Sequence, residues 1–162
     1  MESFRSEQKS IFHFEFRKSD NALFCIRITQ MQNIQRQNIS SGTPWESKAG
    51  YSRAVKIGNL VFVAGTTAAD SEGRVIAAGD PYQQVKYVFN KIESALKQAG
   101  ASLEDVVRTR MFVTDIKFFP EVARAHDEFF HNIRPAATLV EISALQLKEM
   151  LVEIEVDAVL RS

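Results

Sequence analysis

The sequence predicts an α+β protein in which two helices cover one face of a single mixed β-sheet. Two segments carry apolar residues at three- and four-residue spacing, and six shorter segments are rich in β-branched and aromatic residues. From residue 51 onward, the predicted order is β-β-β-α-β-α-β-β. Because each helix has only one apolar stripe, both helices can bury that stripe on the same face of the sheet. The length of 162 residues suits a single domain.

The N-terminal part of the chain is predicted to be an extension, residues 1–30, ahead of the main domain, residues 31–162. Phenylalanines alternate with polar residues in this extension, and a second β-prone run follows a turn-like segment, so residues 11–29 are predicted to form a hairpin. The alternative is an appendage without an evolved role, since the sequence that follows looks complete without it. Residues 32–50 are polar and are predicted to be a loop or linker.

The first two strands of the main domain are predicted at Tyr51–Ile57 and Leu60–Thr66. Gly58 and Asn59 separate the two apolar runs, which predicts a tight hairpin turn with positive φ angles. Gly65 interrupts the second run. A glycine inside a strand often marks a β-bulge or a place where a ligand approaches the backbone.

The first helix is predicted to begin at Asp80-Pro81, a capping residue followed by proline at the first helical position, and to end at Gly100. The second is predicted from near Pro120 to near Asn132, with its apolar stripe buried. The other predicted strands are Arg74–Ala77, Val106–Thr114, Ala136–Ala144 and Leu151–Leu160.

Charged residues gather on one predicted face of the sheet. Three acids alternate with apolar residues in the last strand, and two arginines share a face in the strand that begins at Val106. These residues are Glu153, Glu155, Asp157, Arg108 and Arg110. Two interpretations stay open: a surface ladder of ion pairs, which would contribute little stability, or a face that packs against another subunit.

Composition excludes several classes of function. Lys and Arg number 20, as do Asp and Glu, so the absence of a basic excess argues against nucleic-acid binding. No segment is apolar enough to span a bilayer or to act as a signal peptide, and we expect a cytoplasmic location without membrane contact. The only cysteine excludes an internal disulfide and a multi-cysteine metal site, and the three histidines lack metal-ligand spacing.

No standard catalytic motif is present, and the candidate functional residues are single side chains. His126 lies on the apolar stripe of the second helix and is interpreted as a core or interface residue with a satisfied hydrogen bond. Cys25 is interpreted as an inert strand residue. Trp45 either covers a pocket or only packs, and the Tyr51 hydroxyl either reaches a ligand or anchors the end of its strand.

Several separate segments, in the same order, resemble the RidA/YjgF/YER057c/UK114 family, and together they span about residues 40–160. The resemblance implies a chorismate-mutase-like (YjgF-type) fold and a homotrimer whose sheets form a central β-barrel. It also implies a cleft for a small molecule at each subunit interface. The resembling segments are Gly50–Gly65, Leu96–Val107, Phe112–Asp115, Arg134–Glu141 and Val152–Val156.

The resemblance also implies an activity. Active family members are enamine/imine deaminases, which hydrolyse reactive imines released by PLP-dependent dehydratases to 2-oxo acids and ammonia, without a metal or organic cofactor. By resemblance, Glu153 orients or activates the attacking water. Gly65 is the strand glycine whose neighbouring backbone groups assist, and Tyr51 forms part of the pocket wall.

The chain departs from the family pattern at four cleft positions. Those positions hold Ala137 in place of the arginine that grips the substrate carboxylate, Leu139 in place of a cysteine, Ala123 in place of an asparagine, and His126 in place of another aromatic residue. Arg110 or Arg134 could supply the missing charge from another direction. The sequence therefore resembles the arginine-lacking branches, and we expect a substrate other than a simple 2-iminocarboxylate.

Two main hypotheses follow. The first is a hydrolase of the enamine/imine deaminase type, in which Glu153 positions water while Tyr51, Gly65, Arg110, His126, Ala137 and Leu139 form the substrate-binding site. The alternative is a non-catalytic trimer that binds a small metabolite, which the missing arginine favours. An older family label, endoribonuclease or translation inhibitor, gives a third hypothesis, but the neutral charge argues against it.

Overall fold

The computed structural model describes residues 35–161, so the hairpin predicted at 11–29 and Cys25 lie outside the described residues. Six strands form one mixed sheet. They are β1 (Arg36–Ile39), β2 (Ala54–Ile57), β3 (Leu60–Thr67), β4 (Val106–Val113), β5 (Ala136–Glu141) and β6 (Val152–Val159). Their order in the sheet is β1-β2-β3-β6-β4-β5, with β4 and β5 parallel and every other neighbouring pair antiparallel.

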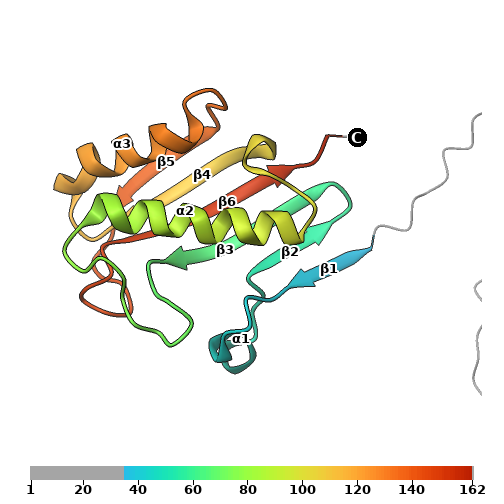
Figure 1. Ribbon diagram of the computed structural model, residues 1–162, viewed down its shortest axis with the longest axis horizontal. Helices are drawn as coiled ribbons and strands as arrows, with labels where there is room; N and C mark the ends of the chain where they lie inside the picture. Colours follow the sequence, from blue (N-terminus) through green and yellow to red (C-terminus); the bar gives the residue numbers. More distant parts are fainter. Residues whose placement is uncertain (1–34, 162) are drawn as a thin grey trace, which may run out of the picture. The chain divides into compact units, whose positions relative to one another are not determined.

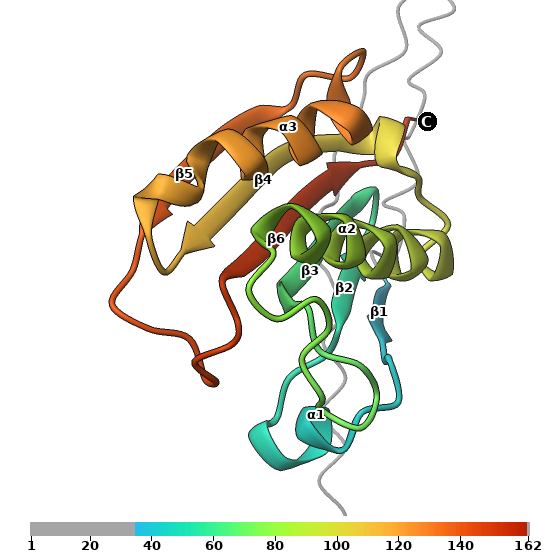
Figure 2. The ribbon, with the colours of Figure 1, turned by 60° about the vertical axis from the view of Figure 1, so that its left-hand side comes forward.

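Two long helices, α2 (Pro81–Gln98) and α3 (Phe119–Phe130), lie side by side on the same face of this sheet (Figures 1 and 2). The predicted start of α2 is confirmed, because the Asp80 side chain accepts a hydrogen bond of 3.0 Å from the backbone N–H of Gln83. The predicted α+β architecture with two helices on one face is therefore confirmed. Short 3₁₀ turns precede β4 and α3, at Leu103–Asp105 and Ile116–Phe118.

The core lies between the helices and the sheet. Four apolar residues of β6 alternate with its acids and are buried under the helices: Val152, Ile154, Val156 and Ala158. From α2 and α3, Phe89 and Phe130 meet edge to face with ring centroids 5.1 Å apart. Each fully buried side chain of this size stabilises the fold by roughly 1.5–3 kcal/mol. This burial fixes the opposite, charged side of β6 on the open face of the sheet.

The predicted hairpin between β2 and β3 is confirmed, with Ile57 paired to Leu60. Gly58 has a φ of 60°, while Asn59 is not among the residues with positive φ, so only half of the predicted turn geometry is found. Of the two alternatives for Gly65, a bulge agrees with the β3–β6 register, which shifts between Val63 and Thr66.

Two predictions for the connecting segments are wrong. Residues 32–50 contain the edge strand β1 and a short helix, α1 (Pro44–Ala49), rather than only loop. In β1 only Ile39 is buried, so the strand exists through its pairing with β2 and has no apolar alternation that the sequence could reveal. Arg74–Ala77 is not a strand, because it contributes one isolated bridge, Ala69 to Val75, within a turn closed by Asp70.

Candidate functional site

The charged row on the open face of the sheet forms as the sequence predicted. Arg110 on β4 donates from Nε to Glu155 Oε2 at 2.8 Å and from Nη1 to Asp157 Oδ2 at 3.0 Å. Arg108 Nε lies 3.9 Å from Asp157 Oδ2. These side chains are partly exposed in the single subunit, where such pairs contribute little stability. Arg110 is thus held by two carboxylates on its own chain.

The next residue of this row, Glu153, lies apart from the arginines and lines a cavity of about 670 Å³. Three of the residues predicted for the site meet here, namely Glu153 from β6, Gly65 from the bulge in β3, and Tyr51 ahead of β2. Trp45 of α1 also lines this cavity and is half exposed, as expected for a residue that covers a pocket. Its polar lining also includes Arg53, Lys91 and Asp70.

The absence of a side chain at Gly65 leaves room for the Glu153 carboxylate. A Cβ atom at residue 65 would lie 2.0 Å from Glu153 Oε1 and 2.9 Å from Glu153 Cδ. Any larger residue would push the carboxylate out of its present position. The glycine predicted as a point of close approach therefore makes room for the candidate catalytic side chain.

The environment of Glu153 changes its proton affinity. Burial raises the pKa of this carboxyl group, the neighbouring Glu155 raises it further, and Arg53 partly offsets both effects. A carboxyl group with a raised pKa holds a proton more readily, which suits it to accept a proton from water and return it.

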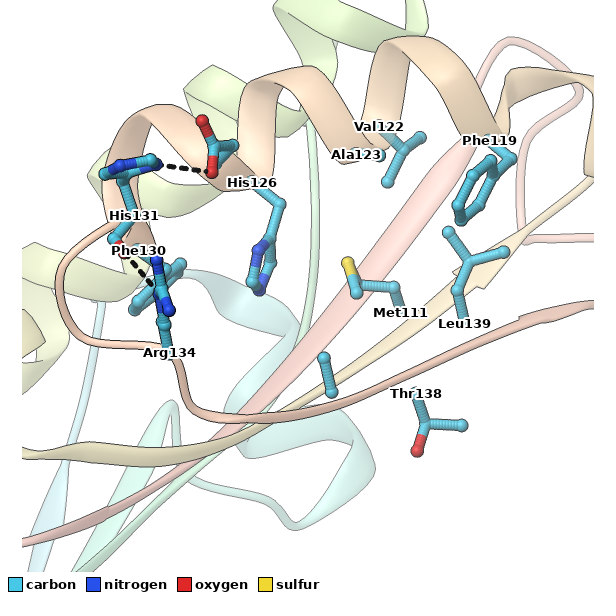
Figure 3. Close-up of a pocket in the computed structure, with 12 residues that line it drawn as sticks. Met111, Phe119, Val122, Ala123, His126, Phe130, His131, Arg134, Thr138 and Leu139 are labelled. Atoms are coloured by element: carbon cyan, nitrogen blue, oxygen red, sulfur yellow. Dashed lines mark hydrogen bonds and ion pairs between the residues drawn. The ribbon is translucent and has the colours of Figure 1, made fainter.

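The other predicted site residues line a second cavity, of about 390 Å³, between α3 and β5 (Figure 3). Ala137 and Leu139 pair with Thr109 and Met111 of β4, so they lie on the helix-covered side of the sheet. The lining is mostly apolar. It comprises Met111, Phe119, Val122, Ala123, His126, Asp127, Phe130, His131, Arg134, Ala137, Thr138 and Leu139.

His126 is held in this second cavity as the sequence interpretation expected. Its Nε2 atom and Thr109 Oγ1 share a hydrogen bond of 3.0 Å, and its ring packs against Phe130 with centroids 4.8 Å apart. Burial lowers the pKa of the imidazole, which favours the neutral form. His126 is therefore a satisfied, largely neutral residue rather than an exposed acid or base.

Neither arginine proposed as a substitute lines the cavity of Glu153. Arg110 is engaged with Glu155 and Asp157, and Arg134 lines the second cavity, where its Nε donates to the His131 carbonyl at 3.1 Å. The cations in the Glu153 cavity are Arg53 and Lys91, which sequence reasoning missed. Arg53 follows the predicted site residue Tyr51 by two positions, and this spacing is the one feature of the sequence that could have indicated it.

Across residues 35–161, no group of three or more His, Cys, Asp or Glu side chains is placed to hold a metal ion. Over the same span, no helix has the length and apolar character needed to cross a membrane.

Comparison with known proteins identifies the family of this chain. The model of the family described as Endoribonuclease L-PSP matches residues 42–160. The chain belongs to the RidA/YjgF/UK114 family. Rv2704 of Mycobacterium tuberculosis, a solved member of the YjgF/YER057c/UK114 family, is 48% identical with a TM-score of 0.71, and the match covers 78% of this chain and all of Rv2704.

Two further relatives are a solved structure of the same fold and a protein named as a deaminase. The YjgF gene product of E. coli is 28% identical with a TM-score of 0.67, over 77% of this chain and 99% of that structure. The 3-aminoacrylate deaminase RutC of Acinetobacter baylyi is 32% identical over 116 residues, which is 72% of this chain and 90% of RutC. The predicted YjgF-type fold is confirmed.

Proposed function

We propose that this RidA-family protein is a hydrolase of the enamine/imine deaminase type, and that the cavity at Glu153 is where it acts. The observation that carries the proposal is the half-buried Glu153 carboxylate, whose pKa is raised, lying against the glycine that makes room for it. A carboxylate with no hydrogen-bond partner among the described residues is available to a water molecule. The deaminase named among the relatives supports the same reaction class.

The reaction follows from the chemistry of that group. Glu153 accepts a proton from water while the water oxygen bonds to the carbon of the C=N group, which gives a tetrahedral carbinolamine. The proton passes from Glu153 to the nitrogen, which completes the neutral carbinolamine. Glu153 then carries the hydroxyl proton to the nitrogen, the C–N bond breaks, and ammonia leaves as the carbonyl forms. Overall, an imine and water give a carbonyl compound and ammonia. An enamine enters the same sequence after protonation at carbon.

The same proposal includes a homotrimer. On one chain Glu153 lies on the open face of the sheet, whereas Ala137 and Leu139 lie on the helix-covered side, so the two sets do not face one another. A cleft between subunits would bring the first cavity of one chain to the second cavity of its neighbour. Exposed apolar residues on the open face, Phe62 beside Asp157 and Val140 beside Phe112, support contact with another copy.

The test is ammonia release from imines that an amino-acid oxidase generates in situ, compared between the wild type and Glu153→Gln. The variant keeps the size of the side chain and removes the base, so we expect the rate to fall by about a hundredfold or more while the fold is retained. The compound named for RutC, 3-aminoacrylate, belongs in the panel. Equal rates for wild type, variant and buffer across the panel would overturn the proposal.

A second candidate function is a trimer that binds a small metabolite without converting it. The apolar lining around Ala137 favours this alternative, because the arginine that grips a carboxylate in the family pattern is absent there. Thermal-shift screening separates the two functions, since a ligand that raises Tm and is recovered unchanged indicates binding alone. Endoribonuclease activity, the family description, would be supported only by RNA cleavage that Glu153→Ala abolishes.

A further inference from the structure

Arg53 is a buried cation that forms no close ion pair among the described residues, although Glu153 and Glu46 interact with its charge at longer range. Its side chain lies in the Glu153 cavity, and the residue is only 8% exposed. Among residues 35–161, no carboxylate lies within ion-pairing distance of its guanidinium. A buried charge without a close partner is unfavourable, and an anion bound beside it would relieve that cost.

The hydrogen bonds of Arg53 fill one side of the guanidinium and leave the other nearly empty. Nη1 donates to the Gly65 carbonyl at 3.0 Å and to Thr66 Oγ1 at 2.9 Å, which fixes the orientation of the group. Nη2 makes only a long contact of 3.4 Å with the Tyr51 hydroxyl, and the buried Nε has no partner. The edge formed by Nε and Nη2 is one that a carboxylate can occupy with both oxygens.

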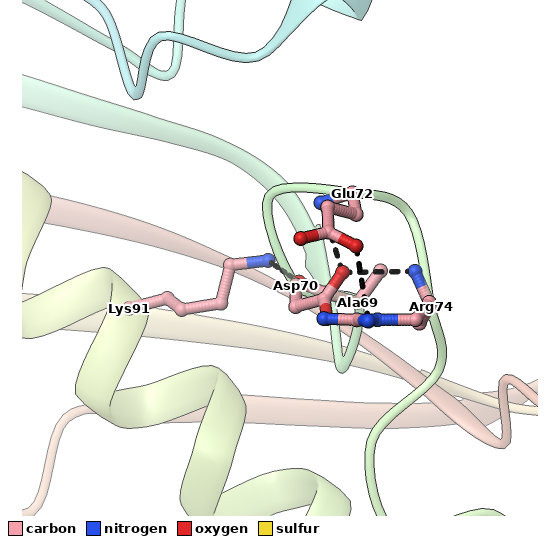
Figure 4. Close-up of polar contacts among 5 residues, drawn as sticks. All are labelled: Ala69, Asp70, Glu72, Arg74 and Lys91. Atoms are coloured by element: carbon pink, nitrogen blue, oxygen red, sulfur yellow. Dashed lines mark hydrogen bonds and ion pairs between the residues drawn. The ribbon is translucent and has the colours of Figure 1, made fainter.

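A second cation faces the same cavity. Lys91 reaches from α2 to the loop after β3, where its Nζ donates to the backbone carbonyls of Thr67 at 3.1 Å and Ala69 at 2.6 Å (Figure 4). The nearby Asp70 compensates this charge only in part and raises the pKa of Lys91, while its carboxylate binds Arg74 at 2.8 Å. Burial lowers the pKa of Lys91 to about 8, and Arg53 contributes to that shift. The two cations are therefore close enough to repel, and an anion between them would relieve both.

We propose that Arg53, assisted by Lys91, binds the carboxylate of a small organic acid in the cavity of Glu153. The site is built entirely by one chain and does not require an arginine at position 137. A ligand reaches the free edge by displacing the Tyr51 hydroxyl, which lies at the cavity surface. The link to catalysis rests on the proposed function, in which the same acid carries the imine or enamine, but binding itself does not depend on it.

The test measures binding of 2-oxobutyrate to the full chain by isothermal titration calorimetry. Butanone, which lacks the carboxylate, and inorganic phosphate serve as comparison ligands. We expect Arg53→Gln to weaken 2-oxobutyrate binding by about tenfold to a hundredfold, since it removes a charge-assisted bidentate contact. Arg53→Lys should bind at an intermediate level, because a lysine cannot engage both oxygens in that way. Arg124→Gln removes the same charge on the exposed side of α3 and is the matched control.

Lys91→Met provides a second variant if Arg53→Gln fails to fold, and we expect it to weaken binding by about threefold to tenfold. The proposal is overturned if the wild type does not bind 2-oxobutyrate, or if butanone or phosphate binds equally well. It is also overturned if the loss appears in Arg110→Gln or Arg134→Gln but not in Arg53→Gln. Tight binding by a protein that releases no ammonia would contradict the proposed function and leave this inference standing.

Discussion

The two cavities of this protein differ in what they keep of the family pattern. The cavity at Glu153 holds a carboxylate with a raised pKa, a glycine fitted to it, and two cations that form no close ion pair among the described residues. The cavity under α3 is mostly apolar, and its histidine is satisfied by Thr109. In the first cavity, charged groups are partly buried without close ion pairs among the described residues. In the second cavity, most lining residues are apolar and the histidine has a hydrogen-bond partner. Burial of charged groups at a cost in folding free energy is typical of functional sites, whereas apolar packing with satisfied hydrogen bonds is typical of structural ones.

The largest effect is expected from Gly65→Ala. The added Cβ would displace the flexible end of Glu153, so ammonia release should fall by about a hundredfold while Tm changes little, because the carboxylate can swing away without disturbing the core. The double variant Gly65→Ala, Glu153→Gln should be no slower than Glu153→Gln alone. Independent, additive losses would show that Gly65 acts in another way.

A smaller effect is expected when the second cavity is given the missing charge. Ala137 is exposed, so an arginine fits there without entering the core. If the two cavities meet between subunits, Ala137→Arg should tighten 2-oxobutyrate binding by about threefold to tenfold. Calorimetry on the variant, with Ala136→Arg on the opposite face of β5 as the control, measures this. An unchanged affinity would show that the second cavity does not contribute to the binding of this ligand.

The pH dependence of stability follows from the raised pKa of Glu153. A carboxyl group whose pKa is higher in the folded state favours folding while it is protonated, and this contribution is lost as the pH rises through the folded-state pKa. Glu153→Gln should therefore raise Tm by a few degrees at pH 7, and the difference should shrink as the pH falls toward 4.5, the ordinary value for the group. Calorimetric melting from pH 4 to pH 8 tests the sign, and a lower Tm for the variant at pH 7 would contradict it.

In the second cavity, we expect a substitution to lower the stability of the fold rather than raise it. Thr109 is fully buried, and Thr109→Val removes its hydrogen bond to His126 without changing the volume of the side chain. The variant should lose about 1 kcal/mol of unfolding free energy, since it leaves the histidine unsatisfied. Urea unfolding at pH 7 measures this loss, and unchanged stability would show that water replaces the threonine.

The sequence predicted those parts of the molecule whose pattern is local. The strict alternation in β6 predicted both its buried and its charged face, and Asp80 with Pro81 predicted the start of α2. The strand β1 was missed, because it has a single buried residue and depends on pairing with β2.

The functional role of Arg53 was also not visible in the sequence. An arginine near the start of a β-prone run is typical of a solvent-facing residue. Its burial depends on the bulge at Gly65, which turns the Gly65 carbonyl and the Thr66 hydroxyl toward the guanidinium. This depends on a contact between segments more than ten residues apart, which residue patterns do not encode.

A crystal structure of the assembled protein with 2-oxobutyrate tests the central claim most directly, because it shows which cavity holds the reacting group. The account predicts the carboxylate on the free edge of Arg53, with the 2-oxo carbon within about 4 Å of a Glu153 oxygen or of a water bound to it. A ligand bound against Ala137 and Arg134 without any contact to Glu153 would contradict the account.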